Sequence, residues 1–252
     1  MSNQIKAVFL DISGVLYDGD HIIPGAREAI SELRKRALTL RFVTNTASQS
    51  SDQILIKLRT LGFELSHAEL ITAPAAAKQY IIKKGLRPFC LIHPNLKSEF
   101  KDIDQTQANA VLLGDAREDL SYKNLNYAFR LCQSGCPLIG IGMNKYFSDG
   151  EQLCLDAGMF IKGIEWAANS PALIMGKPST AFFEQVVASC GIQASQCLMV
   201  GDDVICDIQG ALDSGLRGCL VRTGKYQTKD EQQLKGSAMV IDSIAKLGEH
   251  LN

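Results

Sequence analysis

The sequence of 252 residues lacks the features that would place it in a membrane, in a secretory compartment or on a nucleic acid. No stretch approaches the roughly 18 uninterrupted apolar residues of a membrane span. Residues 1–6 contain no apolar signal region, and the net charge of −1 provides no general attraction for polyanions. We therefore expect a cytoplasmic protein that binds neither nucleic acid nor membrane.

The eight cysteines form no paired motif. There is no Cys-x-x-Cys, and the one close pair, Cys132 and Cys136, flanks a Ser-Gly turn. Others lie in apolar runs such as Cys197-Leu-Met-Val. We expect reduced, mostly buried thiols and no metal–cysteine site.

Several catalytic motifs are also missing. No cysteine is followed six residues later by arginine, which excludes the loop of cysteine-dependent phosphatases. Neither Gly-x-Ser-x-Gly nor His-Glu-x-x-His occurs. Gly140-Ile-Gly142 lacks the third glycine of a dinucleotide-binding fingerprint, so a Rossmann dehydrogenase is disfavoured.

What the sequence does contain is a regular alternation of strand and helix patterns. A content of 46% hydrophobic and 21% charged residues is sufficient for a substantial core. Strands are predicted at residues 5–11, 38–43, 88–92, 108–113, 137–141, 173–175, 197–201 and 217–222. Helices are predicted at about 24–34, 51–62, 74–84, 120–133, 179–190 and 204–214. This order predicts an α/β fold with a parallel sheet and helices on both faces.

The predicted strands differ in the residues at their carboxyl ends. Four of them end in polar clusters, namely those at 5–11, 38–43, 173–175 and 197–201. Residues 75–172 form a block without such endings that is long enough to be a domain. We predict a core built from residues 1–72 and 173–252, with residues 73–172 inserted as a second α/β unit. Trp166 lies in a helical pattern and is expected to pack inside this insertion.

The four polar clusters together contain the groups that phosphoryl transfer requires. They are Asp11 with Ser13, Thr44-Asn45, Lys177 within Gly-Lys-Pro, and Asp202-Asp203 with Asp207. This reaction needs in-line positioning and neutralisation of charge on the phosphoryl oxygens. The carboxylates would repel one another without a cation, and Mg²⁺ suits such all-oxygen ligands. We interpret the clusters as one site, with Asp203 equally suited to the metal neighbourhood or to a helix N-terminus.

The clusters occur in the order and spacing of the haloacid dehalogenase (HAD) superfamily, and the chain resembles its IIA subgroup of aspartate-nucleophile phosphatases. The motifs that carry this resemblance are Phe42-Val-Thr44-Asn45-Thr46, Gly176-Lys177-Pro178, Gly201-Asp202-Asp203 and Tyr122-x-x-Leu125-x-x-Ala128. Two further segments make the resemblance more specific to some members of this subgroup. They are Asp11-Ile-Ser13-Gly14-Val15-Leu16-Tyr17-Asp18 and Arg222-Thr-Gly-Lys225. The resemblance implies a doubly wound, Rossmann-like core with a large inserted α/β cap that selects the substrate and often mediates homodimer formation.

The resemblance also implies a role for each site residue. Asp11 is the nucleophile and forms an aspartyl-phosphate that water hydrolyses, and Lys177 bridges Asp11 and the phosphoryl group. The implied phosphate ligands are Ser13, Gly14, Thr44, Asn45 and Lys177. The implied Mg²⁺ ligands are Asp11, the Ser13 carbonyl and Asp202. Asp207 and Asp203 hold the metal and phosphate ligands in place without being ligands themselves.

One residue departs from the pattern of the family. Most members have a second aspartate where this chain has Ser13, and that aspartate protonates the leaving group and later activates water. A positioned acid–base is worth roughly 10²–10⁴-fold in rate. One interpretation is a catalytically weak, phosphate-binding or regulatory protein, and another is a general phosphatase for nucleotides or sugar phosphates. We favour a third, in which the leaving group needs little protonation, as in phosphohistidine, phospholysine, pyrophosphate and small activated phosphates.

Overall fold

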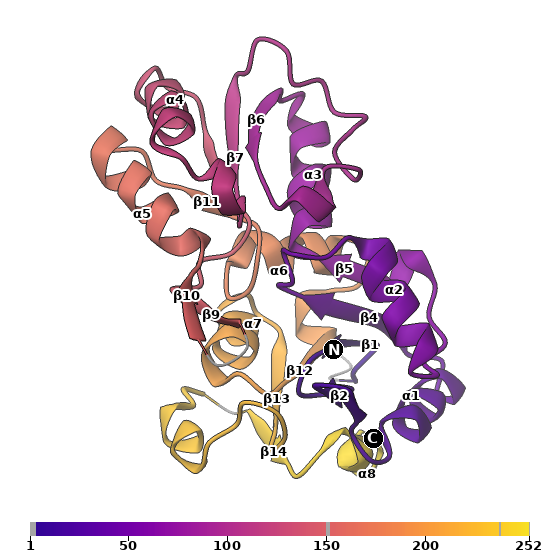
Figure 1. The fold of residues 1–252 in the computed structure, drawn as a ribbon. Coiled ribbons are helices and arrows are strands. Elements are labelled where there is room, and N and C mark those ends of the chain that lie inside the picture. Colours follow the sequence, from indigo (N-terminus) through magenta and orange to yellow (C-terminus); the bar gives the residue numbers. More distant parts are fainter. Residues whose placement is uncertain (1–3, 150–151, 237, 252) are drawn as a thin grey trace. The chain divides into compact units, whose positions relative to one another are not determined.

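The structure is a computed structural model that describes residues 4–149, 152–236 and 238–251 (Figure 1). It divides into two compact units. The core unit contains the described residues of Met1–Thr44, Leu55–Ile71 and Lys177–Asn252. The inserted unit contains those of Asn45–Ile54 and Thr72–Gly176. Helix α2 (Ser51–Thr60) crosses the boundary between them.

A six-stranded sheet in the order β14-β13-β12-β1-β4-β5 organises the core unit. Its strands are β1 (Ala7–Asp11), β4 (Thr39–Thr44), β5 (Leu70–Thr72), β12 (Cys197–Gly201), β13 (Arg217–Val221) and β14 (Met239–Ile241). The pairs β14–β13, β13–β12, β12–β1 and β1–β4 are parallel. Both faces of this sheet are covered, which explains the uninterrupted apolar run of β1, whose first four residues are fully buried.

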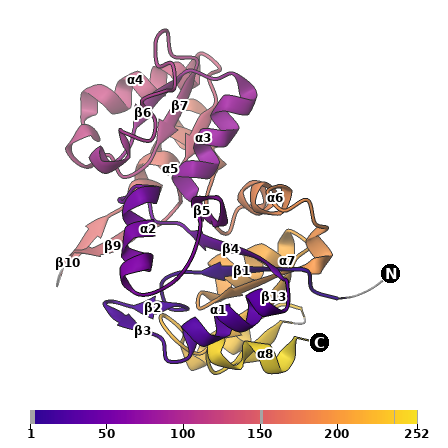
Figure 2. The same ribbon diagram turned by 90° about the vertical axis from the view of Figure 1, so that its right-hand side faces the viewer.

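The helices of the core unit lie on both faces of its sheet. They are α1 (Ala26–Lys35), α6 (Thr180–Ala188), α7 (Gly210–Asp213) and α8 (Leu247–His250). The strands β1 and β12 lie at the centre of the sheet. The chain connects β1 to β4 on one side of this centre and β12 to β13 on the other side. Right-handed crossovers then place α1 and α7 on opposite faces, and Figure 2 shows α1 beside α8 and α7 near α6.

Shorter elements complete the core unit. They are the hairpin β2 (Tyr17–Asp18) with β3 (His21–Ile22), and the short helical turns η1 (His67–Glu69), η4 (Ala194–Gln196), η5 (Val204–Gln209), η6 (Thr228–Gln233) and η7 (Ile244–Lys246). The strand order reverses between β1 and β12. In open α/β sheets, ligands bind outside the carboxyl ends of the strands at such a switch point.

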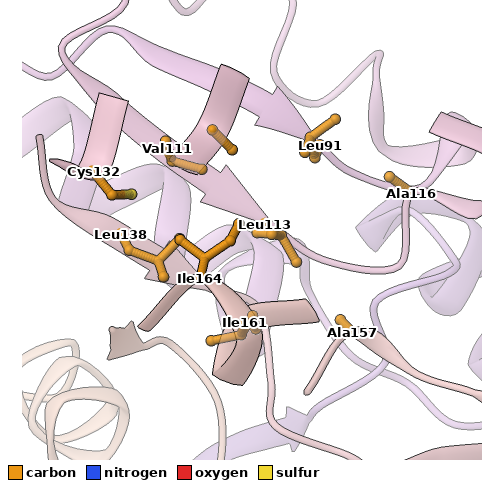
Figure 3. Packing of buried hydrophobic residues seen from close by; sticks show 10 residues of the cluster. Leu91, Val111, Leu113, Ala116, Cys132, Leu138, Ala157, Ile161 and Ile164 are labelled. Atoms are coloured by element: carbon orange, nitrogen blue, oxygen red, sulfur yellow. The ribbon is translucent and has the colours of Figure 1, made fainter. Parts of the chain in front are cut away.

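The inserted unit has its own parallel sheet in the order β11-β8-β7-β6. Its strands are β6 (Pro88–Leu91), β7 (Ala110–Leu113), β8 (Leu138–Gly140) and β11 (Leu173–Ile174), with a separate antiparallel hairpin of β9 (Tyr146–Asp149) and β10 (Gln152–Leu155). Its helices are α3 (Ala73–Lys84), α4 (Tyr122–Gln133), α5 (Ala157–Ala168), η2 (Pro94–Leu96) and η3 (Arg117–Asp119). Figure 3 shows Val111, Leu113 and Leu138 from the sheet packed with Ile161 and Ile164 from α5.

The parallel α/β architecture predicted from the sequence is confirmed, but three details are wrong. Residues 45–54 are predicted in the core, whereas Asn45–Ile54 belong to the inserted unit. The strand predicted at 173–175 belongs to the inserted unit and not to the core, because β11 pairs with β8 in the sheet of that unit. The apolar pattern correctly predicts a strand here, but such a pattern does not specify the sheet to which the strand belongs. Trp166, predicted to pack inside the insertion, is instead 87% exposed on α5. An apolar residue at a helical spacing can lie one step outside the buried stripe.

The described residues contain neither a membrane-spanning helix nor a disulfide. Within residues 4–149, 152–236 and 238–251, no helix is both long and apolar enough to cross a membrane. All eight cysteines are free, and Cys132, Cys197 and Cys219 are buried while the other five are partly buried. Burial raises the pKa of the Cys219 thiol to about 12, so this thiol stays protonated and unreactive at neutral pH.

The packing in Figure 3 predicts that a cavity beside β7, one of the two central strands in the sheet of the inserted unit, lowers stability. Leu113 is fully buried in β7, so Leu113→Ala should lower the free energy of unfolding by about 2–5 kcal/mol in urea titrations followed by circular dichroism. Leu153→Ala is the matched control, because Leu153 is 67% exposed, and it should change stability by no more than about 0.5 kcal/mol. Equal effects of the two substitutions would contradict this packing.

Candidate active site

Three carboxylates converge at the switch point of the core sheet. Asp11 is the last residue of β1, Asp202 directly follows β12, and Asp207 lies in η5. One oxygen from each lies within 4.8 Å of the others. The sequence predicted this convergence from polar residues at two strand ends, and the parallel pairing of β1 with β12 brings it about.

Lys177 is buried among these carboxylates. Its Nζ lies 2.8 Å from Asp11 Oδ1 and 2.6 Å from Asp207 Oδ1, and its side chain is 4% exposed. Burial alone would lower the pKa of Lys177, but Asp11 and Asp207 outweigh this and raise it above its ordinary value. The ammonium group is therefore charged at neutral pH and serves two carboxylates at once.

Asp207 holds Lys177 in place from the interior side. Its side chain is fully buried, with Oδ1 paired to Lys177 and Oδ2 accepting the Asp203 N–H at 3.1 Å. Burial raises the pKa of Asp207, and the Lys177 ion pair acts against that rise. A Cβ on Gly201 would lie 2.2 Å from Asp207 Oδ2, so only glycine at this position admits the carboxylate. With both oxygens engaged, Asp207 is a structural partner of Lys177.

Asp202 is arranged differently. Its Oδ2 accepts the Lys225 N–H at 2.7 Å, whereas its Oδ1 is buried and has no hydrogen-bond partner within the part of the chain that the structure describes. Burial raises the pKa of Asp202 to about 6; the charge of Asp11 adds to the rise, and the Lys225 N–H and the Lys225 and Lys177 charges oppose it. A buried carboxylate oxygen without a partner is costly unless a ligand completes it.

The composition of the cluster fits a hard divalent cation. Three carboxylates surround one ammonium group, so the ionised cluster carries two excess negative charges. All candidate ligand atoms of the side chains are oxygens, which Mg²⁺ prefers, and Asp202 Oδ1 is the oxygen left for it. The residues therefore fit a hard divalent cation.

The turn after β1 brings Ser13 and Gly14 to the same edge. Ser13 is exposed, and Gly14 adopts a φ of +82° that favours glycine. The Gly14 N–H donates to Tyr17 O at 2.7 Å, so in this structure it is already engaged and does not face a ligand. Burial, and in addition the negative charge of Asp11, raise the pKa of Tyr17. Thr44 ends β4 in a buried position.

Asp203 and Asn45 have other surroundings. The Asp203 carboxylate accepts the Ile205 N–H at 3.0 Å and the Cys206 N–H at 2.8 Å, so it caps the N-terminus of η5. Of the two roles that the sequence allowed for Asp203, the structure shows the cap. Asn45 opens a segment of the inserted unit, where its Oδ1 lies 3.1 Å from the position of a Cβ on Gly176.

Sequence reasoning missed the contribution of Arg222–Lys225. The sequence pointed to this segment only through a family resemblance, yet its backbone contacts Asp202 and its Thr223 side chain contacts Gly14. The available signal was positional, because the segment comes directly after the strand next to β12. Only the strand order, which the sequence did not specify, reveals that proximity.

The chain belongs to the haloacid dehalogenase-like hydrolases. A family model described as haloacid dehalogenase-like hydrolase matches residues 8–106, and one described as HAD-hydrolase-like matches residues 174–247. The first stretch contains Asp11 and the second contains Lys177 and Asp202. The family, the fold class and the enzyme class predicted from the sequence, a phosphatase of this family, are confirmed.

Individual relatives resemble the chain over nearly its full length. The human protein named phospholysine phosphohistidine inorganic pyrophosphate phosphatase is 42% identical over 251 residues, covering 96% of this chain and 92% of the relative. Human haloacid dehalogenase-like hydrolase domain-containing protein 2 is 39% identical over 230 residues, covering 91% and 89%. The crystal structure of a 4-nitrophenylphosphatase from Thermotoga maritima superimposes with a TM-score of 0.88 at 25% identity, covering 99% and 98%.

The charge balance at Asp202 predicts a pH-dependent stability of the metal-free protein. Because the folded-state pKa of about 6 lies above the ordinary value of 3.8, the folded protein binds a proton more readily than the unfolded chain. Stability in EDTA should fall as the pH rises from about 4 to about 6. Asp202→Asn should reduce this fall, with the remainder coming from Asp207, whose pKa burial also raises. At pH 8 the substitution should raise the free energy of unfolding by on the order of 1–3 kcal/mol.

The control for this measurement is Asp203→Asn, which also removes a carboxylate but leaves a side chain that can cap η5. Urea titrations in EDTA at pH 4, 6 and 8 would compare the three proteins. A fall in stability that persists unchanged in Asp202→Asn would contradict the assignment of that titration to Asp202.

Proposed function

We propose that this chain is a Mg²⁺-dependent phosphatase that acts through an aspartyl-phosphate on Asp11. The observation that carries the proposal is the placement of the Asp11 carboxylate at the end of β1. It lies 2.8 Å from the buried Lys177 ammonium and beside Asp202, whose Oδ1 has no hydrogen-bond partner among the described residues. A carboxylate in this setting is exposed enough to meet a substrate, with 13% of its side chain accessible.

In the first step, an Asp11 oxygen attacks phosphorus and forms a P–O bond. The bond to the leaving group breaks, and the leaving group takes the electron pair of that bond. Lys177 offsets the negative charge that gathers when a carboxylate approaches a phosphoryl group, and the Thr44 hydroxyl binds a phosphoryl oxygen. Such positioning and charge neutralisation account for most of the catalysis of phosphoryl transfer.

The residues that would hold Mg²⁺ are Asp11, the Ser13 carbonyl and Asp202. When bound, the ion supplies positive charge for the phosphoryl oxygens and a fixed point for their orientation. Asp202 contributes its Oδ1, because its Oδ2 is occupied by the Lys225 N–H. Asp207 keeps Lys177 directed at Asp11 throughout.

In the second step, water attacks phosphorus and the P–O bond to Asp11 breaks. Asp11 regains its carboxylate, and the two protons of water leave with phosphate as H₂PO₄⁻, so the step balances without a side-chain base. This matters here because Ser13 stands where a carboxylate base is usual in the family. The Ser13 hydroxyl is a poor proton donor and acceptor near neutral pH.

The absence of a carboxylic acid at position 13 favours substrates whose leaving group needs no proton from the enzyme. An alkoxide is strongly basic, whereas phosphohistidine releases neutral imidazole, with a conjugate-acid pKa of about 6.5, once its second ring nitrogen has taken a proton from solvent. We therefore infer that phosphohistidine, phospholysine and inorganic pyrophosphate are preferred over alkyl phosphate esters. A human relative that is 42% identical carries these three substrates in its name, which supports the inference.

Small activated aryl phosphates are a second candidate class. The 4-nitrophenylphosphatase from Thermotoga maritima shares the fold over almost the whole chain. A nitrophenolate is also a weakly basic leaving group, so the same site chemistry applies to it. We assign the choice among these substrates to the inserted unit.

The direct test is Mg²⁺-dependent phosphate release from phosphohistidine, pyrophosphate, 4-nitrophenyl phosphate and a sugar phosphate. The wild type should release phosphate from the first three, and EDTA should abolish the release. Asp11→Asn should reduce kcat by at least about 10³-fold on each substrate, because the amide cannot form the covalent intermediate.

Binding without turnover would instead favour a phosphate-binding or regulatory protein. A preference for the sugar phosphate would keep the phosphatase and refute the leaving-group argument. Asp203→Asn is the control, and its activity should stay within about 3-fold of the wild type because its cap is retained.

Ser13→Asp tests the leaving-group argument separately. A carboxyl group at this position supplies the missing acid–base, so kcat/KM for the sugar phosphate should rise by about 10-fold or more, while the rate on phosphohistidine should change little. Ser13→Asn, which has a similar size but no acid, is the matched control and should not increase ester hydrolysis. An unchanged or lower rate on the ester in Ser13→Asp would show that protonation of the leaving group does not limit this enzyme.

A further inference from the structure

The segment Arg222–Lys225, here called the β13 loop, lies beside the carboxylate cluster because of where its strand ends. It continues from β13, which pairs in parallel with β12, and Asp202 directly follows β12. The carboxyl ends of parallel neighbours lie at the same edge of a sheet. The loop is therefore adjacent to Asp202 although 20 or more residues separate them in sequence.

Two hydrogen bonds from the β13 loop connect the two halves of the site. The Lys225 N–H donates to Asp202 Oδ2 at 2.7 Å. The Thr223 hydroxyl donates to the Gly14 carbonyl, in the turn that follows Asp11. One short loop thus contacts both the carboxylate after β12 and the backbone after β1.

Two glycines allow this close approach. A Cβ on Gly224 would lie 2.2 Å from Asp202 Oδ2 and 2.4 Å from Gly14 Cα, and a Cβ on Gly14 would lie 2.1 Å from the same carboxylate oxygen. Both glycines have positive φ values, of +63° and +82°. Two backbone segments therefore enclose Asp202 Oδ2 from different sides with no side chain between them.

The rest of the loop is fixed to the core unit. The Arg222 guanidinium donates to Glu231 Oε1 and Asp242 Oδ1, each at 2.8 Å, and the Tyr226 hydroxyl donates to Glu231 Oε1 at 2.6 Å. The Arg222 backbone N–H donates to Ile241 O on β14 at 3.0 Å. Each exposed ion pair contributes little energy, but together these contacts restrict where the loop can lie.

We propose that the β13 loop is a positioning element for Asp202 that fixes which carboxylate oxygen faces the cation. By engaging Oδ2, the loop prevents rotation of the carboxylate and leaves Oδ1 as its only oxygen for a metal. By donating to Gly14 O, Thr223 holds the turn after Asp11 at a constant distance from Asp202. The inference rests on the proposed Mg²⁺ dependence, and it assigns Thr223 and Gly224 a role that lies outside the reacting groups.

The test compares Mg²⁺ affinity in Thr223→Val and Thr223→Ser. Valine has nearly the shape of threonine but cannot donate to Gly14 O, whereas serine restores the hydroxyl. Loss of a group bonded directly to a metal ligand typically costs 10–100-fold in affinity, and Thr223 bonds the residue next to a ligand, so we expect an effect at the lower end of that range. Calorimetric titration with MgCl₂ without substrate should show the dissociation constant about 10-fold higher in Thr223→Val and within about 2-fold of the wild type in Thr223→Ser.

Two further variants separate positioning from general stability. Gly224→Ala should weaken Mg²⁺ binding more than Thr223→Val, because its Cβ would collide with Asp202 Oδ2. Thr228→Val makes the same chemical change at an exposed residue of η6 and should leave affinity unchanged. In Thr223→Val, the Mg²⁺ concentration for half-maximal phosphate release should rise by a similar factor while kcat at saturating Mg²⁺ stays within about 2-fold.

The outcomes distinguish this inference from the proposed function. If the wild type binds Mg²⁺ and both Thr223→Val and Gly224→Ala bind it equally well, the positioning role is refuted and the phosphatase proposal stands. If Thr223→Val only lowers the melting temperature without changing the Mg²⁺ dissociation constant, the loop is structural and the inference is also refuted. If the wild type itself binds no Mg²⁺, both proposals fail.

Discussion

The structure of the site depends on one buried cation, the Lys177 ammonium, which lies between Asp11 and Asp207. Charged groups are expensive to bury, and this one is nearly inaccessible to water. Removing one partner of a buried ion pair typically costs about 3–5 kcal/mol, because it leaves an uncompensated charge. Lys177 therefore has to stay where it is, and its position in turn fixes the nucleophile candidate at the end of β1.

The three carboxylates around Lys177 have different tasks because their oxygens are engaged differently. Asp207 uses both oxygens inside the protein and supports Lys177. Asp202 uses one oxygen inside the protein and leaves the other without a partner among the described residues. Asp11 pairs with Lys177 and remains partly accessible. The number of engaged oxygens therefore distinguishes the three roles. Asp207 is the supporting residue, Asp202 is the proposed metal ligand, and Asp11 is the group that meets the substrate.

The sequence predicts which residues form the site better than it predicts the contacts between them. The polar residues at the ends of the strands near 11 and 201 converge as expected, since a parallel sheet places such ends at one edge. The sequence could not decide the role of Asp203, because capping depends on where η5 begins relative to the carboxylate. It could not reveal the β13 loop either, since that contact depends on strand order. The prediction that residues 173–175 belong to the core was wrong for the same reason. A two-residue apolar strand can pair in either sheet, and only the strand order decides which.

The central claim is that Asp11 becomes covalently phosphorylated. Borohydride reduces an acyl-phosphate to an alcohol, so enzyme quenched during turnover of phosphohistidine would carry homoserine in place of the phosphorylated aspartate. Peptide mass spectrometry should find homoserine at position 11 in the wild type only when substrate and Mg²⁺ are both present, and nowhere in Asp11→Asn. Steady turnover with no homoserine at position 11, or with homoserine at another aspartate, would contradict the account.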